Sequence, residues 1–516
     1  MQIKKNIIKI IGIEIKKIRD MQNTVKVKKI NYNTGKEPFF FLNKKSPVVV
    51  THGFDGGIRV EIKNKDKKLS GELVIVEGDN VKIDEIGLSD RAFKRFGLSE
   101  GTEVEVSHIP TLKSFAAVRS KMFGNPIGKE EMFAIIQDIV NGYYTPSHIA
   151  AFCSVCEGQN MNDDEISYLT NAMVKTGQTI KWDYDIVVDK HCIGGIPANR
   201  TTNVVIPIVA AYGLHIPKTS SRAITSPSGT ADTMEVLCNV DVGLERMKEI
   251  VKKCNGCMVW GGSVNLSPSD DLIINTKKIL NIDSEGQMVA SILSKKIAAG
   301  STHVLIVVPV GPTAKVKTNE DFNRLKNTFE TTGKKLGVHV VVAYEEGLEP
   351  IGNGIGPSLE CKDLLKLFKN EADAPQDLKE ISLGLAGQII EFDPKVKKGE
   401  GAKIAKEILE SGKAYKKFME IVEAQGDIRE IPTAKFTTDI LSEKDGEISE
   451  IDNKKITQTC RLVGCPDVKA AGIFLYKHLK NKVKKGDKLF TIHANSEGEM
   501  KQAVEYCKTN EIVKVK

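Results

Sequence analysis

The stretch DKHCIGGIPANRTT, Asp189 to Thr202, places a lysine, a histidine, two glycines and two threonines directly after the apolar run 186–188. Such a run is typical of a buried strand, and the residues after it would form the loop at its carboxyl end. Ligands of α/β sheets usually bind at these loops. Glycines let backbone N–H groups approach an anion, and a lysine supplies positive charge. The stretch therefore predicts an oxyanion site, most simply for phosphate.

Strands and helices alternate along the chain on both sides of this stretch. Apolar segments such as HVLIVVPV (303–310) and VHVVVAYE (338–345) are separated by segments with helical spacing, such as SEGQMVASILSKKIAAG (284–300). This alternation predicts crossover connections and a sheet covered by helices. We expect an α/β fold with a central, mainly parallel sheet.

The length of 516 residues indicates more than one core, and we expect four parts. Alternating apolar and polar residues predict a β-rich N-terminal domain, whereas the next segment has helical spacing. In the C-terminal part we expect strands around a helix at VKAAGIFLYKHL (468–479). The predicted parts are 1–110 (β-rich), 111–182 with part of 265–300 (helical lobe), 183–430 (α/β, phosphate-binding) and 431–516 (α+β).

The composition is that of an ordinary globular protein, with 41% hydrophobic and 27% charged residues. No run of 18 or more apolar residues predicts a membrane helix. The opening segment, 1–19, is interrupted by lysines and lacks a signal-peptide cleavage pattern. We therefore expect a cytoplasmic protein with no membrane partner.

Positive charge is concentrated near the N-terminus. Residues 1–70 hold 17 Lys and Arg against 6 Asp and Glu, a net +11, which leaves −4 over the remainder of the +7 chain. A basic domain of this kind could bind nucleic acid. Because no aromatic-interleaved basic motif or helix-turn-helix signature accompanies the charge, we favour a solvated surface and expect no nucleic-acid partner.

The ten cysteines suggest reduced thiols rather than a disulfide framework. Two CxxC pairs, Cys153/Cys156 and Cys254/Cys257, could in principle supply four thiolates to a zinc ion. Both pairs fall on or near expected helices, where residues at i and i+3 share one face. We therefore expect buried thiols and no metal site.

A second polar loop lies about 30 residues after the first. KTSSRAITSPSGTADTMEVL, Lys218 to Leu237, holds hydroxyl residues, Arg222 and a glycine directly before an expected helix. Thr230 or Asp232 could simply cap that helix. A hydroxyl-rich loop that leads into a helix N-terminus also suits an anion. Two such loops at the ends of neighbouring strands favour a shared binding site.

The expected helix at 284–300 carries a third set of polar residues. Ser284 and Gln287 fit a capping box. Ser291 and Lys295 share a face at i and i+4, whereas we expect Lys296 to face solvent. Lys295 could alternatively stabilise the helix C-terminus. We interpret a further glycine-rich segment, IGNGIGPSLE (351–360), as a tight turn before a helix.

Three of these segments resemble signatures of the pyrimidine-nucleoside and thymidine phosphorylases. KHCIGG is similar to the family's KH[S/T]xGG, SSRAITSPSGT to its SGRGxGHTGGT, and SILSKK to its serine-and-lysine helix. The long N-terminal extension resembles that of a subgroup which includes archaeal AMP phosphorylases. The likeness runs over about residues 24–510.

The resemblance implies a reversible phosphorolysis in which phosphate attacks C1′ of a nucleoside and the base leaves. For thymidine the products are thymine and 2-deoxy-D-ribose 1-phosphate. No metal or organic cofactor is implied, since phosphate is a co-substrate, and a homodimer or larger homo-oligomer is expected. The implied residues are Lys190 and His191 for catalysis; Lys190, Gly194, Gly195, Thr201, Ser220 and Thr230 for phosphate; and His191, Arg222, Ser291 and Lys295 for the nucleoside.

The charges that develop in this reaction agree with these implied roles. Cleavage of an N-glycosidic bond builds positive charge on the sugar and negative charge on the base. A phosphate dianion would support the first charge, and His191 and Lys295 could stabilise the second. His191 has an intrinsic pKa that also suits proton donation.

The sequence departs from the family pattern at two places. Cys192 stands where the family has a hydroxyl after the histidine, and a thiol is a poor donor to phosphate. The arginine expected near Thr276 in the base site is absent. An AMP phosphorylase that yields ribose 1,5-bisphosphate therefore stays an alternative, with Arg200 or Arg222 as cations for the 5′-phosphate.

Overall fold

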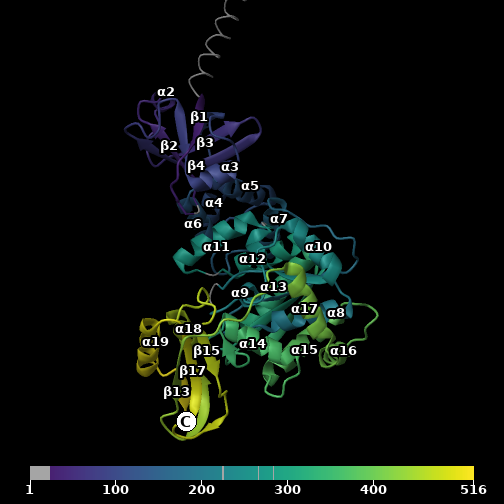
Figure 1. Cartoon of the computed structure of the whole chain (residues 1–516). Coiled ribbons are helices and arrows are strands. Elements are labelled where there is room, and N and C mark those ends of the chain that lie inside the picture. Colours follow the sequence, from purple (N-terminus) through teal and green to yellow (C-terminus); the bar gives the residue numbers. More distant parts are fainter. Residues whose placement is uncertain (1–23, 36, 224–225, 265, 283) are drawn as a thin grey trace, which may run out of the picture. The chain divides into compact units, whose positions relative to one another are not determined.

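A computed structural model describes residues 24–35, 37–223, 226–264, 266–282 and 284–516. The described residues form two compact units (Figure 1), which lie within Met1–Asn160 with Ser269–Asp283 and within Met161–Pro268 with Ser284–Lys516. The expectation for the basic opening segment falls on residues 1–23 and so lies outside the described residues. Among the described helices none is long and apolar enough to cross a membrane.

The first unit contains a closed six-stranded barrel with the order β1-β5-β2-β4-β3-β6. Phe40, Leu42, Val60, Ile62 and Leu73 fill its interior and are fully buried. They come from the apolar positions of alternating strands, which is why this segment was predicted to be β-rich. The elements are β1 (Thr24–Lys29), β2 (Phe39–Asn43), α2 (Pro47–His52), β3 (Arg59–Asn64), β4 (Lys67–Val76), β5 (Glu85–Leu88), α3 (Asp90–Phe96) and β6 (Glu103–His108).

Helices make up the remainder of the described first unit. They carry the i, i+3, i+4 apolar spacing read from the sequence, and in α5 this spacing buries Met132, Ile135, Ile136 and Ile139. The helices are α4 (Phe115–Met122), α5 (Lys129–Val140), α6 (Pro146–Val155) and α11 (Pro268–Leu280).

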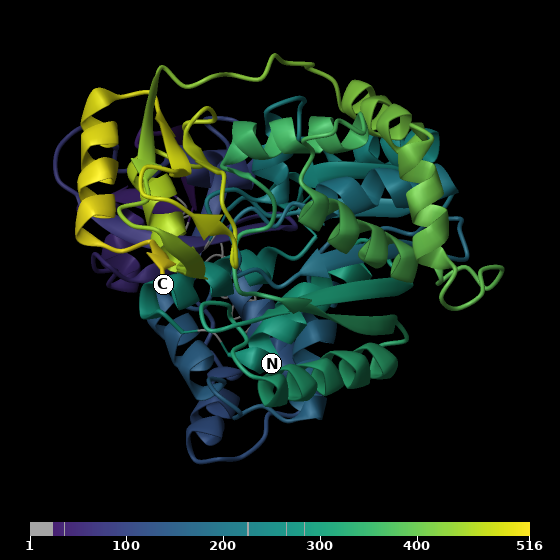
Figure 2. The same ribbon diagram turned by 90° about the horizontal axis from the view of Figure 1, so that it is seen from below.

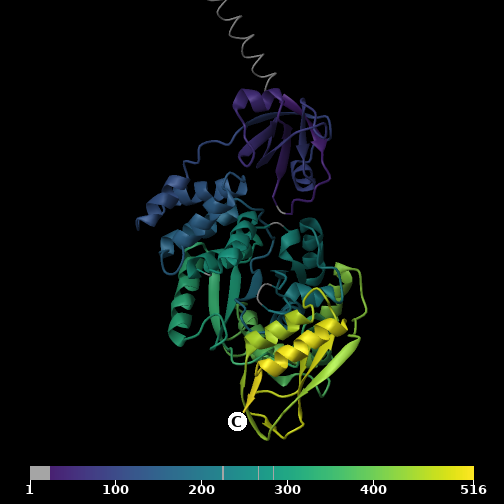
Figure 3. The ribbon, with the colours of Figure 1, turned by 90° about the vertical axis from the view of Figure 1, so that its left-hand side faces the viewer.

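The second unit is built on parallel strands, as the alternating pattern predicted. The order β11-β10-β7 continues into β8-β9 through a parallel bridge between Val187 and His215. Every pairing in this set is parallel, and α13 packs beside β11 (Figure 3). The strands are β7 (Val188–Cys192), β8 (Ile216–Ser220), β9 (Gly256–Trp260), β10 (His303–Val310) and β11 (His339–Glu346). The structure thus confirms the α/β class.

Helices surround these strands, and α8 is the most deeply buried of them. Ten consecutive residues of α8, 201–210, are buried, because α15, α16 and α17 pack beside it (Figure 1). The helices are α7 (Asp163–Lys175), α8 (Thr201–Tyr212), α9 (Thr230–Glu235), α10 (Leu244–Cys254), α12 (Glu285–Ala298), α13 (Asn319–Lys335), α14 (Pro357–Phe368), α15 (Gln376–Ile390), α16 (Gly401–Glu410) and α17 (Lys413–Gln425).

Two antiparallel sheets form the C-terminal part, with the orders β12-β15-β17-β13 and β16-β14-β18. Helix α19 packs on β13 and β17 (Figure 2). The elements are β12 (Gly354–Ile355), β13 (Phe436–Leu441), β14 (Gly446–Ile451), α18 (Asn453–Leu462), β15 (Gly472–Leu475), β16 (Lys482–Val483), β17 (Lys488–Ala494), α19 (Glu497–Thr509) and β18 (Val513–Val515).

The prediction of a helix at 468–479 is wrong, because the segment contains strand β15. Gly472 has φ +153°, and Ile473 and Leu475 are buried between β12 and β17. A short apolar run fits a buried strand as well as a helix, and here pairing on both edges decides. The predicted turn at 351–360 contributes β12 to this sheet before α14 begins at Pro357. The four-part division of the chain stays a prediction.

Candidate functional site

Lys190 lies in β7 with its ammonium group held by two hydroxyls. Its Nζ donates to Thr201 Oγ1 at 2.6 Å and to Thr202 Oγ1 at 3.1 Å. The side chain is fully buried, because β7 lies between β10 and β8, and burial lowers the pKa of Lys190. The structure therefore brings together two residues that the sequence predicted for phosphate binding, Lys190 and Thr201.

The loop between β7 and α8 has the geometry that its glycines suggested. Gly194 and Gly195 have φ +87° and +103°. A Cβ on Gly195 would stand 2.9 Å from the backbone nitrogen of Lys315, so this position needs glycine. Arg200 precedes α8 and makes no side-chain cap bond, and its backbone oxygen accepts from the backbone nitrogen of Asn203 at 2.9 Å. A helix start beside a lysine favours an anion.

The second predicted loop follows β8 and leads into α9. Ser220 is the last residue of β8 and Thr230 the first of α9, and both are half-buried. Asp232 Oδ2 accepts from the backbone nitrogens of Ala223 and Gly229, so this carboxylate shapes the loop. That is the capping role which the sequence left open for Asp232.

Arg222 is engaged by acidic partners. Its guanidinium donates to Glu235 through both terminal nitrogens, at 2.6 and 2.7 Å, and lies 5.1 Å from the ring centre of Trp260. Hydrogen bonds from Arg222 lower the pKa of Glu235 to about 2. A bidentate pair of this kind fixes Arg222 in place. Its predicted contact with the nucleoside stays a prediction.

Helix α12 presents Ser291 and Lys295 on one half-buried face, as their spacing predicted. The expectation that Lys296 faces solvent is wrong. Lys296 is 2% exposed, and its Nζ lies 2.8 Å from Asp189 Oδ2 on β7. An acidic partner on the neighbouring strand explains why the second lysine of the pair turns inward.

Sequence reasoning missed the buried charges that lie next to Lys190 in β7 and β8. Asp189 and Lys218 are buried, and the Lys218 Nζ lies 3.5 Å from Asp189 Oδ1. Burial lowers the pKa of Lys218 to about 7. The available signal was a charged residue inside each of two strands, where a buried charge must find a partner.

His191 sits among cations that oppose its protonation. Burial holds its pKa well below the usual range, and the charges of Lys218, Lys296 and Lys295 lower it further. The ring is therefore neutral near pH 7 in this structure and can donate one N–H hydrogen bond. The expected role of His191 as a proton donor stays a prediction, as does its expected contact with the base.

Cys192, which replaces the family's hydroxyl, belongs to a small polar network. Asn199 Nδ2 donates to Glu345 Oε1 at 2.7 Å and contacts Cys192 Sγ at 3.3 Å. Thr201 Oγ1 donates to Asn199 Oδ1 at 2.8 Å. Burial raises the pKa of Cys192 to about 11, so the thiol is neutral. The network holds Thr201 against Lys190.

Arg200, a candidate for binding a 5′-phosphate, is completely buried. Its guanidinium pairs with Asp363 and donates to the backbone oxygen of Gly354 at 2.7 Å. Both arginines proposed for the AMP alternative, Arg200 and Arg222, are thus paired with carboxylates of the protein.

The two CxxC pairs are buried thiols, as expected. Cys153, Cys156, Cys254 and Cys257 are all free and buried. Burial raises the pKa of Cys153 to about 12 and also raises that of Cys257. Protonated thiols pack as small apolar groups.

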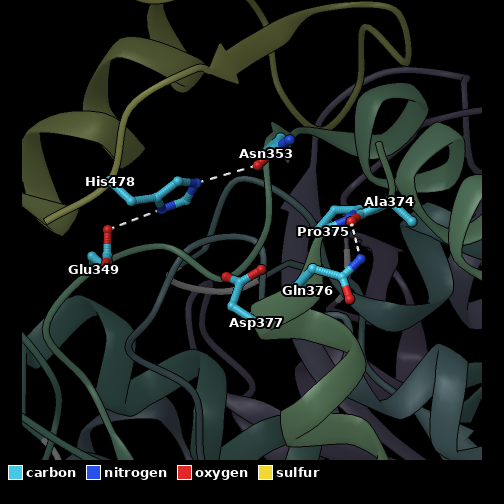
Figure 4. A pocket seen from close by; sticks show the side chains of 7 residues that line it. All are labelled: Glu349, Asn353, Ala374, Pro375, Gln376, Asp377 and His478. Atoms are coloured by element: carbon cyan, nitrogen blue, oxygen red, sulfur yellow. Dashed lines mark hydrogen bonds and ion pairs between the residues drawn. The ribbon is translucent and has the colours of Figure 1, made fainter. Parts of the chain in front are cut away.

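A separate hollow of about 330 Å³ lies beside α15 (Figure 4). His478 crosses one end of it, with Nδ1 3.0 Å from Glu349 Oε2 and Nε2 3.2 Å from Asn353 Oδ1. None of the predicted site residues lines it. Its lining consists of Glu349, Asn353, Ala374, Pro375, Gln376, Asp377 and His478. The carboxylates make it unsuited to a phosphate, which the Lys190 loop suits better.

The parallel sheet carries a buried lysine and two hydroxyls at the start of α8, which suits the binding of an anion. Family models define the class of protein. The model "Glycosyl transferase family, a/b domain" matches residues 184–415, and "Glycosyl transferase family, helical bundle domain" matches 116–177. "Pyrimidine nucleoside phosphorylase C-terminal domain" matches 448–513.

Proteins of similar sequence match nearly the whole chain. A "Putative thymidine phosphorylase" of Legionella pneumophila (strain Corby) is 44% identical over 479 residues, 93% of each chain. One of Bradyrhizobium diazoefficiens is 46% identical over 474 residues, 91% of this chain and 92% of that one. The chain belongs to the thymidine and pyrimidine-nucleoside phosphorylase family and is a pentosyltransferase.

Among solved structures, the fold is similar to that of anthranilate phosphoribosyltransferase (TrpD) from Thermus thermophilus. The match has a TM-score of 0.51 and 18% identity, and covers 60% of this chain and 99% of that one. At this identity the likeness concerns the fold alone.

Proposed function

We propose that this enzyme catalyses the reversible phosphorolysis of thymidine to thymine and 2-deoxy-D-ribose 1-phosphate. One observation carries the proposal: the buried Lys190 ammonium, bonded to Thr201 and Thr202, lies beside the start of α8. A lysine, hydroxyls and helix N–H groups together suit a phosphate dianion. The names of the relatives support thymidine as the nucleoside.

The chemistry follows from the charges that develop in the reaction. Phosphate bound at the Lys190 loop attacks C1′ as the bond to the base breaks, and the bonding electrons leave with the base. The neutral His191 ring donates an N–H hydrogen bond to the base carbonyl, where negative charge appears. Lys295, whose charge already acts on His191, adds electrostatic stabilisation. Phosphate is the nucleophile, and no other cofactor takes part in the proposed reaction.

An AMP phosphorylase would need a further cation for the 5′-phosphate of its substrate. Arg200 and Arg222, the two candidates, are already paired with Asp363 and Glu235. Satisfied ion pairs make poor additional anion sites, since binding would require breaking them. We therefore favour a nucleoside over a nucleoside monophosphate.

The test is a substrate panel of thymidine, uridine and AMP, each with and without inorganic phosphate. We expect phosphate-dependent release of thymine and formation of a pentose 1-phosphate. Equal release of base without phosphate would favour a hydrolase and overturn the proposal. Turnover of AMP alone, with ribose 1,5-bisphosphate as product, would replace thymidine by the monophosphate. Light scattering after gel filtration tests the accompanying proposal of a homodimer or larger oligomer.

A further inference from the structure

Three lysines and one aspartate are buried together next to the proposed phosphate site, and two of the lysines pair with the aspartate. Lys190, Lys218 and Lys296 are 0%, 3% and 2% exposed, and Asp189 is 0% exposed. We call these four residues the lysine cluster. Charges are rarely buried without matching partners, because removing an ion from water is costly. The excess of buried positive charge in the lysine cluster therefore needs a physical reason.

The lysine cluster has more positive than negative groups. Asp189 is its own carboxylate, and Glu345 acts electrostatically on Lys190 from β11. Burial raises the pKa of Glu345, which further reduces the negative charge available. Burial lowers the pKa of Lys218 to about 7, so the third positive charge is only partly present at neutral pH. An arriving dianion would favour the charged form of Lys218.

Lys218 and Asp189 together hold the backbone on both sides of the Lys190 Cα atom. Its Nζ donates to the backbone oxygen of Lys190 at 2.7 Å and lies 3.5 Å from Asp189 Oδ1. The same Asp189 Oδ1 accepts from the backbone nitrogen of Lys190 at 2.7 Å. Lys218 reaches these groups from β8, the strand next to β7. It thereby fixes the backbone from which the Lys190 side chain extends to Thr201 and Thr202.

We propose that Lys218 is a positioning residue of the phosphate site: its charge holds Asp189 and the Lys190 backbone so that the Lys190 ammonium faces the bound dianion. This inference rests on the proposed function, because it takes the Lys190 loop as the place where phosphate binds. Lys218 itself does not contact the nucleoside in this scheme. A purely structural lysine would affect stability without a selective effect on phosphate.

The test compares the full-length wild-type protein with Lys218→Met, Lys218→Arg and a control, Lys252→Met, whose side chain is exposed on α10. Steady-state kinetics give kcat and the KM values for phosphate and for thymidine, and calorimetry gives the Kd of sulfate. Sulfate is a dianion that binds without turnover.

For Lys218→Met we expect KM for phosphate and Kd for sulfate to rise about tenfold or more, the usual effect of losing a charge-assisted contact. KM for thymidine should change by less than about twofold. Lys218→Arg should recover part of the loss, and Lys252→Met should match wild type. If Lys218→Met does not fold, as judged by circular dichroism, Lys218→Gln replaces it with the same expectation.

Wild-type sulfate affinity in the folded uncharged variant would overturn the proposal, as would an equal weakening of phosphate and thymidine. Failure of the proposed function gives a different result. If wild-type protein cleaves no nucleoside of the panel, the reaction is wrong, whereas the sulfate titrations still decide whether Lys218 supports a dianion site.

Discussion

The Nζ of Lys296 lies 2.8 Å from Asp189 Oδ2, and both side chains are buried between α12 and β7. Asp189 also lies 3.5 Å from the Lys218 Nζ, so it is a shared counter-charge for two lysines. Removing its charge would leave both buried ammonium groups without this counter-charge.

We therefore expect Asp189→Asn to lower the free energy of unfolding by about 3–5 kcal/mol, the usual loss when one partner of a buried pair is removed. Urea denaturation at pH 7 measures it. The exposed Asp241→Asn is the control and should change stability by less than about 0.5 kcal/mol. A similar small change for Asp189→Asn would mean that the lysines are neutral in the folded protein.

For His191 we expect substitution by Ala to lower kcat about 10²-fold, because the hydrogen bond to the departing base strengthens as charge reaches it. His191→Asn keeps an N–H donor and should recover part of the rate. Steady-state kinetics with saturating phosphate measure both variants. Near wild-type turnover in the alanine variant would make His191 a packing residue.

The pH profile separates the two roles that the sequence allowed for His191. Burial and the charges of neighbouring lysines hold the pKa of His191 well below its usual range, so the neutral ring already dominates where an ordinary histidine would titrate. An imidazolium acid would instead lose activity as pH rises through its pKa. We expect kcat at saturating phosphate to show no such fall near pH 6.5. A fall that disappears in His191→Asn would restore the proton-donor role.

How much of this site the sequence could predict depends on which residues meet across strands. The glycines, Lys190 and Thr201 share one strand–loop–helix connection, so their proximity followed from local spacing. Lys218 and Lys296 reach Asp189 from β8 and α12, and only the parallel order β10-β7-β8 brings them together. For the same reason Lys296 was expected to face solvent: helical periodicity gives a face, but not the acidic strand that covers it.

The C-terminal part illustrates the same limit for secondary structure. Residues 472–475 were expected to be helical, yet they pair with β12, which comes from more than 100 residues earlier in the chain. Local propensity is a weak guide where strand partners are distant in sequence. The parallel sheet was easier to predict, because its strands alternate with helices along the chain.

Dianion binding should depend on pH through Lys218. Its pKa of about 7 lies below the usual 10.5, so the group is charged below pH 7 and neutral above it. Since the charged form supports the anion, sulfate affinity should fall about tenfold between about pH 6 and about pH 8.5. Sulfate keeps its charge over this range, unlike phosphate, and calorimetry measures the affinity.

The titratable groups that interact with Lys218 include Asp189, Lys190, His191, Lys296 and the buried thiols of Cys192 and Cys257. Burial raises the pKa of Cys257, so this thiol stays neutral across the range. Lys190 could contribute, because burial lowers its pKa too. Lys218→Met separates them: the pH dependence should become flatter in this variant, and an unchanged profile would assign the titration to another group.

We expect the site to divide its two ligands, the dianion and the base, between different elements. Lys190 lies in β7 and Thr230 starts α9, whereas Ser291 and Lys295 share a face of α12. If α12 recognises the base, Lys295→Met should raise KM for thymidine by the equivalent of about 1–3 kcal/mol, the loss expected when a hydrogen-bonded partner is removed. The Kd of sulfate should stay within about twofold of wild type. Thr230→Val should do the opposite, and Lys252→Met again provides the matched lysine control.

Titrating each variant with sulfate and with thymine separates the two effects. Loss of sulfate binding in Lys295→Met with thymine binding intact would reverse the assignment, and equal weakening of both ligands would mean that the two elements contribute to one undivided site.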